Sequence, residues 1–372
     1  MQLIGIPSLL MGRKKGKGFM NKPIVLVIHG MGTHEPGKLK TDITEGLNEA
    51  ANNFGLDDFD ISEKVEFFQF NYSSFLDEVR QRDADHASSV ADHLAKLKGY
   101  GLGETIVTKL TEFFAGFDED EMLYTHWMDV VYYGLMFWGE KIRVDFSHKI
   151  NDVMVEANRG NRHVHIIAHS LGSAVVHDTL AKLFRKDVDV TSAVPGLDIA
   201  KFRIQSLWTV ANVSRLLNLL NDIADPNKSI VNATDDGCCE NLFNVRNLFD
   251  PFTWVKQYNR DEGNYRLLEV DTVRHWNTHD VREYMATPPV SAYFFNYVLG
   301  LELSQEQWDS GVARHAETTV KKSVDDLKVA FEDLRDLPDS EDRIKALEQM
   351  FTTAKAFMDR MKSITEGADS EQ

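Results

Sequence analysis

Cysteine is almost absent from this chain: two occur in 372 residues, Cys238 and Cys239, and they are adjacent. Adjacent cysteines seldom bridge each other, so a disulfide framework is excluded and a reducing compartment is the simplest interpretation. The apolar stretch at residues 1–11 has neither a basic leader region nor a convincing cleavage site, which indicates that no signal peptide is present. Together these features predict a cytoplasmic protein.

Positive charge is also scarce, because 41 Lys and Arg stand against 58 Asp and Glu, for a formal net charge of −17. Nucleic acid is therefore not an expected partner, since phosphates are bound by Lys and Arg that replace their counterions. Stable docking on anionic lipid is disfavoured for the same reason. A local basic cluster at residues 13–17 lies in a glycine-rich stretch, and we interpret residues 1–22 as a flexible, solvated arm.

The sequence has no apolar run that would cross a bilayer comfortably, so we expect no transmembrane segment. The stretch richest in Met, Tyr, Trp and Phe, residues 121–138, is short and carries His126 and Asp129. We interpret it as a buried helix or a lid. A lid over the site would favour a substrate with an acyl chain or another apolar group. Alternatively, Trp127 and Trp138 only fill the core between helix and sheet.

What the sequence does contain is a regular alternation of strand-like and helix-like segments. The β-branched run at residues 23–29 is typical of a strand covered on both faces. Further strands are predicted at residues 64–70, 164–168, 202–211, 242–248 and 265–270, with helices at 39–54, 75–98, 142–158, 174–183, 213–223 and 281–285. This order predicts the α/β class, a doubly wound and mostly parallel sheet with helices on both faces.

Beyond this core, helical spacing of apolar residues recurs twice within residues 320–361. We therefore divide the chain into the arm, a catalytic domain at residues 23–300 with a helical insertion or cap at about 71–150, and a C-terminal helical hairpin at 301–372. The hairpin either packs on the core or serves a protein partner or a homo-oligomer.

The most informative motif is the run Ala168-His169-Ser170-Leu171-Gly172, between the strand at 164–168 and a helix. A serine becomes a nucleophile on such a strand-to-helix turn, which is tight enough to require small residues two positions before and after it. Ala168 and Gly172 meet that requirement. The turn exposes Ser170 Oγ and points the backbone N–H of Leu171 at the reacting oxygen.

A serine hydroxyl needs a base to take its proton and a carboxylate to hold that base. In a doubly wound sheet both partners follow later strands, in the order serine, acid, histidine. Asp250 follows the strand at 242–248 directly, and His279 follows the strand at 265–270 after a loop. The weaker candidates are His275 for the base and, for the acid, three residues of polar loops: Asp225, Asp235 and Asp236.

The loop His29-Gly30-Met31-Gly32 follows the first strand, where a second backbone donor for a developing oxyanion is expected. Gly30 and Gly32 allow the backbone to approach closely, and the Met31 N–H is the predicted donor beside that of Leu171.

These motifs resemble those of the α/β-hydrolases of the serine lipase and esterase kind, over roughly residues 23–300. The residues that carry the resemblance are His29, Gly30, Met31, Gly32, Ala168, His169, Ser170, Leu171, Gly172, Asp250, Pro251, Thr278 and His279. The His-Ser-Leu-Gly elbow is similar to that of the group resembling GPI inositol-deacylases. Ala168 departs from the usual glycine of the family. The resemblance implies a Ser-His-Asp triad of Ser170, His279 and Asp250, an acyl-enzyme, no cofactor, no metal, and a small-molecule or lipid ester or thioester as substrate.

Two alternatives stand beside this hypothesis. His163 and His165 lie on one face of a strand with a spacing that hydrolytic metal sites use, and His34, His29 and His169 could join them. The other alternative is an α/β-hydrolase fold that has lost catalysis and serves as a binding module.

Overall fold

The computed structural model describes residues 21–32, 35–84, 129–130, 132–134, 138–197, 204–254, 256–275, 277–319 and 356. In this part of the chain, six strands form one sheet in the order β2-β1-β3-β4-β5-β6, and every pairing is parallel. The strands are β1 (Ile24–Ile28), β2 (Glu66–Phe70), β3 (Val164–His169), β4 (Ser206–Val210), β5 (Leu242–Asn247) and β6 (Tyr265–Val270). The predicted α/β class with a parallel sheet is confirmed.

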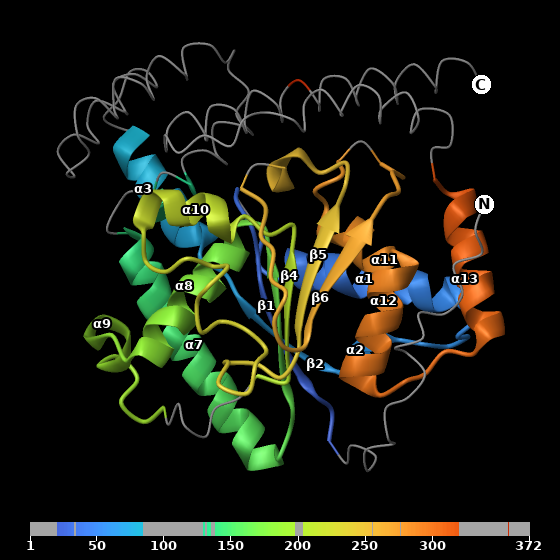
Figure 1. Cartoon of the computed structure of the whole chain (residues 1–372), viewed down its shortest axis with the longest axis horizontal. Helices are drawn as coiled ribbons and strands as arrows, with labels where there is room; N and C mark the ends of the chain where they lie inside the picture. The colour runs from blue at the N-terminus through green and yellow to red at the C-terminus, as the bar shows by residue number, and fades with distance from the viewer. Residues whose placement is uncertain are drawn as a thin grey trace.

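Helices cover both faces of the sheet, as Figure 1 shows. One layer contains α3 (Ser73–Ala84), α7 (Trp138–Gly160), α8 (Leu171–Arg185) and α10 (Ser214–Asn221). The other contains α1 (Lys38–Asn53), α11 (Val281–Ala286), α12 (Pro288–Phe294), the π-helical turn η4 (Phe295–Leu299) and α13 (Gln305–Glu317). The short elements α2 (Ile61–Lys64), α9 (Val188–Thr191) and η3 (Pro251–Thr253) lie in connections.

The unbroken apolar run of β1 follows from this sandwich of layers. Ile24, Leu26 and Ile28 belong to the core under α7 and α8, whereas Val25 and Val27 belong to the core under α1 and α11. Because successive side chains of a strand point to opposite faces, a central strand with two covered faces needs apolar residues throughout.

Most predicted elements occur where expected, with shifted ends. The strand predicted at residues 64–70 begins at Glu66, because Asp60 caps the short helix α2, accepting a hydrogen bond from Ser62 N at 2.9 Å. The strand predicted at 202–211 is ordered as β4 from Ser206, and the helix predicted at 142–158 extends over Trp138–Gly160.

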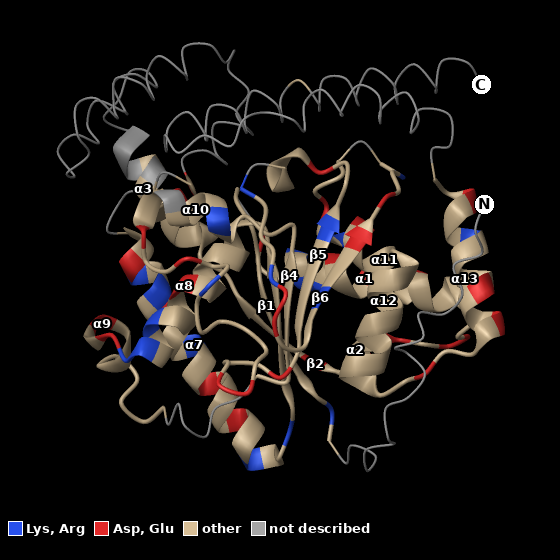
Figure 2. Cartoon of the chain, viewed as in Figure 1, with Lys and Arg blue, Asp and Glu red and all other residues tan. Residues whose placement is uncertain are grey.

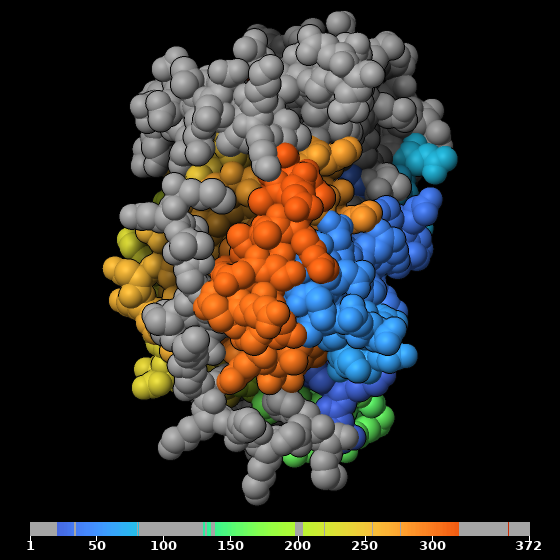
Figure 3. All heavy atoms as spheres, turned by 90° about the vertical axis from the view of Figure 1, so that its right-hand side faces the viewer, coloured from blue at the N-terminus to red at the C-terminus, as the bar shows by residue number. Residues whose placement is uncertain are grey.

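The helix α13 lies within the range 301–372 that was predicted to be helical, but before the apolar runs on which that prediction rested, and it belongs to the second core. Trp308 and Gly311 of α13 pack against Phe54 at the end of α1. Figure 3 shows this orange segment beside the blue of α1 and its neighbours. The amphipathic runs at 320–361 lie outside the described residues, apart from residue 356.

Charges of both signs stand side by side on α7 and α13 (Figure 2). In the described part of the chain, no helix combines the length and apolar character that crossing a membrane requires. Within the stretch predicted as a buried or lid helix, Trp138 packs edge-on against Phe75 with ring centroids 5.5 Å apart. This contact fits core filling for Trp138, whereas Trp127 lies outside the described residues.

Candidate active site

The strand order reverses at β1, beside the carboxyl ends of β1 and β3. The chain moves from β1 to β2 on one side and then returns to place β3 on the other side of β1. In doubly wound sheets such a reversal leaves a crevice where ligands bind. Ile28 of β1 pairs with Ala168 of β3, so the segments that leave these two strands begin side by side. Those segments are the loop that starts at His29 and the turn at Ser170.

Ser170 occupies a strained turn between β3 and α8. Its φ of 53° and ψ of −125° lie outside the regions that suit a side chain, at a cost of about 1–3 kcal/mol. The turn is held because Ser170 N–H donates to Val210 O of β4 at 2.9 Å. Gly172 allows it, since a Cβ there would lie 2.5 Å from His29 O. The Leu171 N–H begins α8, where the first amides have no partner within the helix.

The loop after β1 lies directly against the serine. A Cβ on Gly30 would lie 2.6 Å from Ser170 Cβ and 3.0 Å from Ser170 Oγ, so only glycine fits there. Ser170 Oγ itself is buried and has no hydrogen-bond partner in the described part of the chain. None of the described residues therefore engages this hydroxyl in a structural hydrogen bond.

Asp250 and His279 meet across the ends of β5 and β6. The fully buried Asp250 Oδ2 lies 2.7 Å from His279 Nδ1, which must donate because the carboxylate accepts. The Phe252 N–H donates to Asp250 Oδ1 at 3.0 Å, and Thr278 Oγ1 joins the two loops by donating to Phe249 O at 2.7 Å. His279 Nε2, the atom that would act as base, is buried and has no hydrogen-bond partner among the described residues, so it is not bonded to Ser170 Oγ.

Tyr284 is a third partner of this carboxylate, and no sequence motif predicted it. Tyr284 lies on α11, and its hydroxyl donates to Asp250 Oδ2 at 2.7 Å. Burial, and then the charge of Asp250, raise the pKa of Tyr284 well above its ordinary value, so the hydroxyl keeps its proton and remains a donor.

His169 connects the His279 loop to the elbow. Its Nε2–H donates to the carbonyl of His279 at 2.8 Å, and the two rings lie 4.9 Å apart between centroids. The Phe252 ring contacts His279 as well, at 4.6 Å. The His279 imidazole thus lies between the rings of His169 and Phe252.

The weaker candidates lie elsewhere. His275 Nδ1 accepts from Asn277 N at 3.2 Å, and its side chain lines a cavity of about 10 Å³ with Arg274 and His315. Asp225 Oδ1 caps its own turn by accepting from Asn227 N, and Asp235 and Asp236 are exposed. Of the carboxylates predicted as candidates, Asp250 is the one that contacts His279.

The metal hypothesis gains no support from the described residues, among which no cluster of three or more His, Cys, Asp or Glu could hold an ion. His163 and His165 lie at the amino end of β3, the opposite end from Ser170. His165 Nδ1 lies 2.7 Å from Ser206 Oγ, within hydrogen-bond distance. His34 lies outside the described residues.

A second Ser-His-Asp chain joins His177 and Asp178 of α8 to Ser229 of a later loop, away from the elbow. Ser229 Oγ lies 2.8 Å from His177 Nε2, and His177 Nδ1 lies 3.0 Å from Asp178 Oδ1. However, Ser229 Oγ also accepts from Arg260 Nη2 and from Val231 N, each at 3.3 Å. Both of its lone pairs are occupied, so this serine is poorly placed to attack a carbonyl, and the chain acts as a buried polar support.

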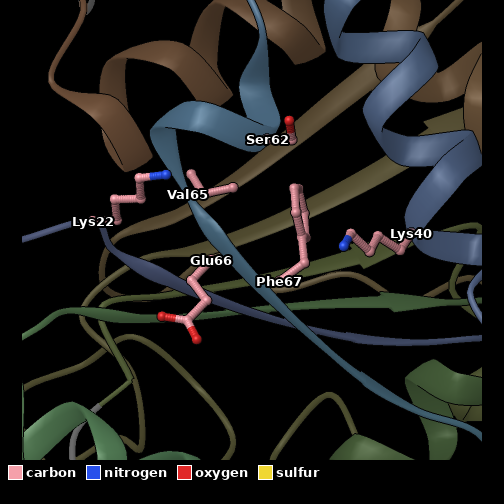
Figure 4. Close-up of a pocket in the computed structure, with 6 residues that line it drawn as sticks. All are labelled: Lys22, Lys40, Ser62, Val65, Glu66 and Phe67. Carbon is pink, nitrogen blue, oxygen red and sulfur yellow. The ribbon is translucent and has the colours of Figure 1, made fainter.

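The cavity of about 240 Å³ beside β2 is also separate from the elbow (Figure 4). It is lined by Lys22, Lys40, Ser62, Val65, Glu66 and Phe67. Lys22 precedes β1 and Glu66 begins β2, so this space lies at the amino ends of the strands and does not communicate with Ser170 through the sheet.

Comparisons of this chain with protein-family models, with curated proteins and with solved structures find no match.

Proposed function

We propose that this protein is a serine hydrolase of the α/β-hydrolase kind, which cleaves a carboxylic ester, a thioester or a lipid acyl bond. The observation that carries the proposal is the Asp250–His279 pair, 2.7 Å apart, at the same sheet edge as an unpartnered serine on a strained elbow. Such a set activates a serine hydroxyl when the histidine comes within hydrogen-bond reach of it. In this chain Ser170 Oγ and His279 Nε2 do not form that bond, which apo active sites often lack until substrate binds. The strand order supports the proposal, because the order reverses between β1 and β3, and doubly wound sheets bind their ligands at such a point.

In the proposed reaction, Ser170 Oγ attacks the acyl carbon while His279 Nε2 takes the hydroxyl proton. The Asp250 carboxylate keeps the other ring nitrogen protonated and stabilises the imidazolium. The backbone N–H groups of Met31 and Leu171 hold the negative oxygen of the tetrahedral intermediate.

When the intermediate collapses, the bond to the leaving group breaks and His279 returns its proton to that group. A water then attacks the acyl-enzyme with His279 as base, and the acid product and free Ser170 are formed.

The resemblance to the group of GPI inositol-deacylases extends the proposal toward acylated lipids. A reducing, cytoplasmic setting is also part of the proposal, and it is supported by two buried cysteines that form no disulfide.

The test is labelling of the purified protein with a fluorophosphonate probe, followed by mass spectrometry of the modified peptide. We expect modification at Ser170, its loss in Ser170→Ala and His279→Ala, and its retention in Ser229→Ala, which removes the serine of the second Ser-His-Asp chain. Ser170→Ala should also lose nearly all ester turnover while it keeps the fold. A folded wild-type protein that is never modified would overturn the proposal in favour of a binding module.

A further inference from the structure

The carbonyl of Gly30 is held by two donors. Tyr72 Oη–H donates to it at 2.7 Å, and His29 Nδ1 lies 2.8 Å away and must donate, because a carbonyl oxygen only accepts. Tyr72 is itself buried and stacks on the His29 ring at 4.1 Å between centroids. The peptide plane that begins at Gly30 is therefore fixed in orientation.

That plane carries the amide proposed as oxyanion donor. A trans peptide is planar, and its C=O and N–H point in opposite directions. Because the two hydrogen bonds fix the Gly30 carbonyl, the Met31 N–H points away from Tyr72. Gly30 lies against Ser170 Oγ, so this amide belongs to the immediate surroundings of the nucleophile.

The next peptide is held from a different segment. Asp129 Oδ2 accepts from the Gly32 N–H at 2.7 Å, and the Asp129 side chain is fully buried. Gly32 has a φ of 90°, which a residue with a side chain adopts only under strain. A buried carboxylate is costly unless donors satisfy it, and a bond from an amide to a carboxylate is about twice as strong as a neutral one.

Asp129 also acts on Tyr72 through its charge. Burial, and then the charge of Asp129, raise the pKa of Tyr72 well above its ordinary value. The Tyr72 hydroxyl therefore keeps its proton and remains a donor to Gly30. Both residues come from the stretch at 71–150, which the sequence analysis treats as an insertion or cap.

We infer that Tyr72 and Asp129 are positioning residues, which fix the peptides on either side of Met31 and so preset the oxyanion hole. The inference rests on the proposed serine hydrolase function. It gives two residues of the stretch at 71–150 a catalytic purpose, because the elbow alone cannot orient the second donor. Preset donors lower the barrier since they need no rearrangement when charge develops.

The experiment compares Asp129→Ala, Asp129→Asn and Tyr72→Phe with the wild-type chain. We expect Asp129→Ala to lower kcat for a p-nitrophenyl ester about 10-fold with little change in KM, less than the 10²–10³ that follows loss of an oxyanion donor itself. Asp129→Asn should recover most of the loss, because its amide oxygen still accepts from Gly32. Tyr72→Phe should lower kcat several-fold, and each variant should label more slowly at Ser170.

Tyr133→Phe is the matched control. Tyr133 lies on the same segment as Asp129, but its hydroxyl donates to Asp178 of α8, at 2.8 Å. The Tyr133→Phe variant should therefore keep the kcat of the wild type. An equal loss of kcat in this control, or wild-type labelling rates in both Asp129→Ala and Tyr72→Phe, would overturn the inference and leave the proposed function intact. A wild-type chain that neither labels nor hydrolyses the ester would overturn both.

Discussion

At the residue scale, Tyr284 provides a direct test of how the acid is held. Tyr284→Phe removes the hydroxyl that donates to Asp250 Oδ2 and accepts from Asn247 N at 3.1 Å. The buried carboxylate then keeps His279 and Phe252 N as donors and loses its third. We expect the free energy of unfolding to fall by about 1–3 kcal/mol, the cost of a buried group left unsatisfied. Ester turnover should fall several-fold, as measured by kcat and by urea denaturation.

Tyr293→Phe is the control for this change, since Tyr293 is also buried, belongs to α12 and packs against Phe243 through its ring. It should retain both stability and turnover. If Tyr284→Phe behaves in the same way, the hydroxyl contributes nothing to the acid and Asp250 is held by its other partners alone.

Asp250 and His279 could be predicted because each follows a recognisable strand, and parallel strands bring their carboxyl ends to one edge. Tyr284 could not, because a buried tyrosine on an amphipathic helix has the same sequence pattern whether or not its hydroxyl finds a carboxylate. Asp129 was visible as a charge in an apolar stretch, an unusual signal, but its partner Gly32 lies 97 positions away and only the folded chain identifies it.

At the element scale, Gly172 controls how closely α8 approaches β1. A Cβ at this position would lie 2.5 Å from His29 O and 2.9 Å from Ile28 O, which are backbone atoms and cannot rotate away. Gly172→Ala should therefore shift α8 and lower the free energy of unfolding by about 1–3 kcal/mol. Because α8 carries Leu171 and follows Ser170, labelling of Ser170 should slow as well.

The matched control is Gly196→Ala, because a Cβ there would meet nothing within 4 Å. Its stability should stay within about 0.5 kcal/mol of the wild type. A Gly172→Ala protein with wild-type stability and labelling would mean that the elbow tolerates a wider separation of α8 and β1 than the structure indicates.

The ends of elements were harder to predict than their existence. Period and β-branching located the strands, but β2 starts late because the side chain of Asp60 caps α2, a local competition that hydropathy does not report. The bounds of α13, inside the range predicted as a helical hairpin, were not predicted because its sequence is polar, with Trp308, Gly311 and His315 as its buried residues. Its N-terminus carries a capping box of Ser304 and Gln307, and that was the signal available to find it.

At the scale of the whole molecule, one arginine joins the helices of the second layer below the His279 loop. Arg274 pairs with Glu49 of α1 and donates to Glu283 of α11, its Nε lying 2.7 Å from Oε2. His315 of α13 lies beside this group and is 4 % exposed. Desolvation, and then the charge of Arg274, lower the pKa of His315 to about 4, and Glu283 and Glu49 offset only part of this. The layer is thus assembled around a neutral histidine.

This environment predicts a loss of stability in mild acid. An unfolded His315 titrates near 6.5, so between pH 6.5 and 4 the unfolded chain binds a proton that the folded chain refuses. Stability therefore falls as the pH drops through this window, by about 2 kcal/mol from this residue between pH 7.5 and pH 5. In His315→Gln this contribution should vanish. Lowering the pH from 7.5 to 5 should therefore reduce the unfolding free energy of the wild type by about 2 kcal/mol more than that of the variant. Urea denaturation of both proteins at the two pH values measures it. A difference that does not change with pH would show that α13 accommodates the charged imidazole, and that the second layer does not depend on keeping it neutral.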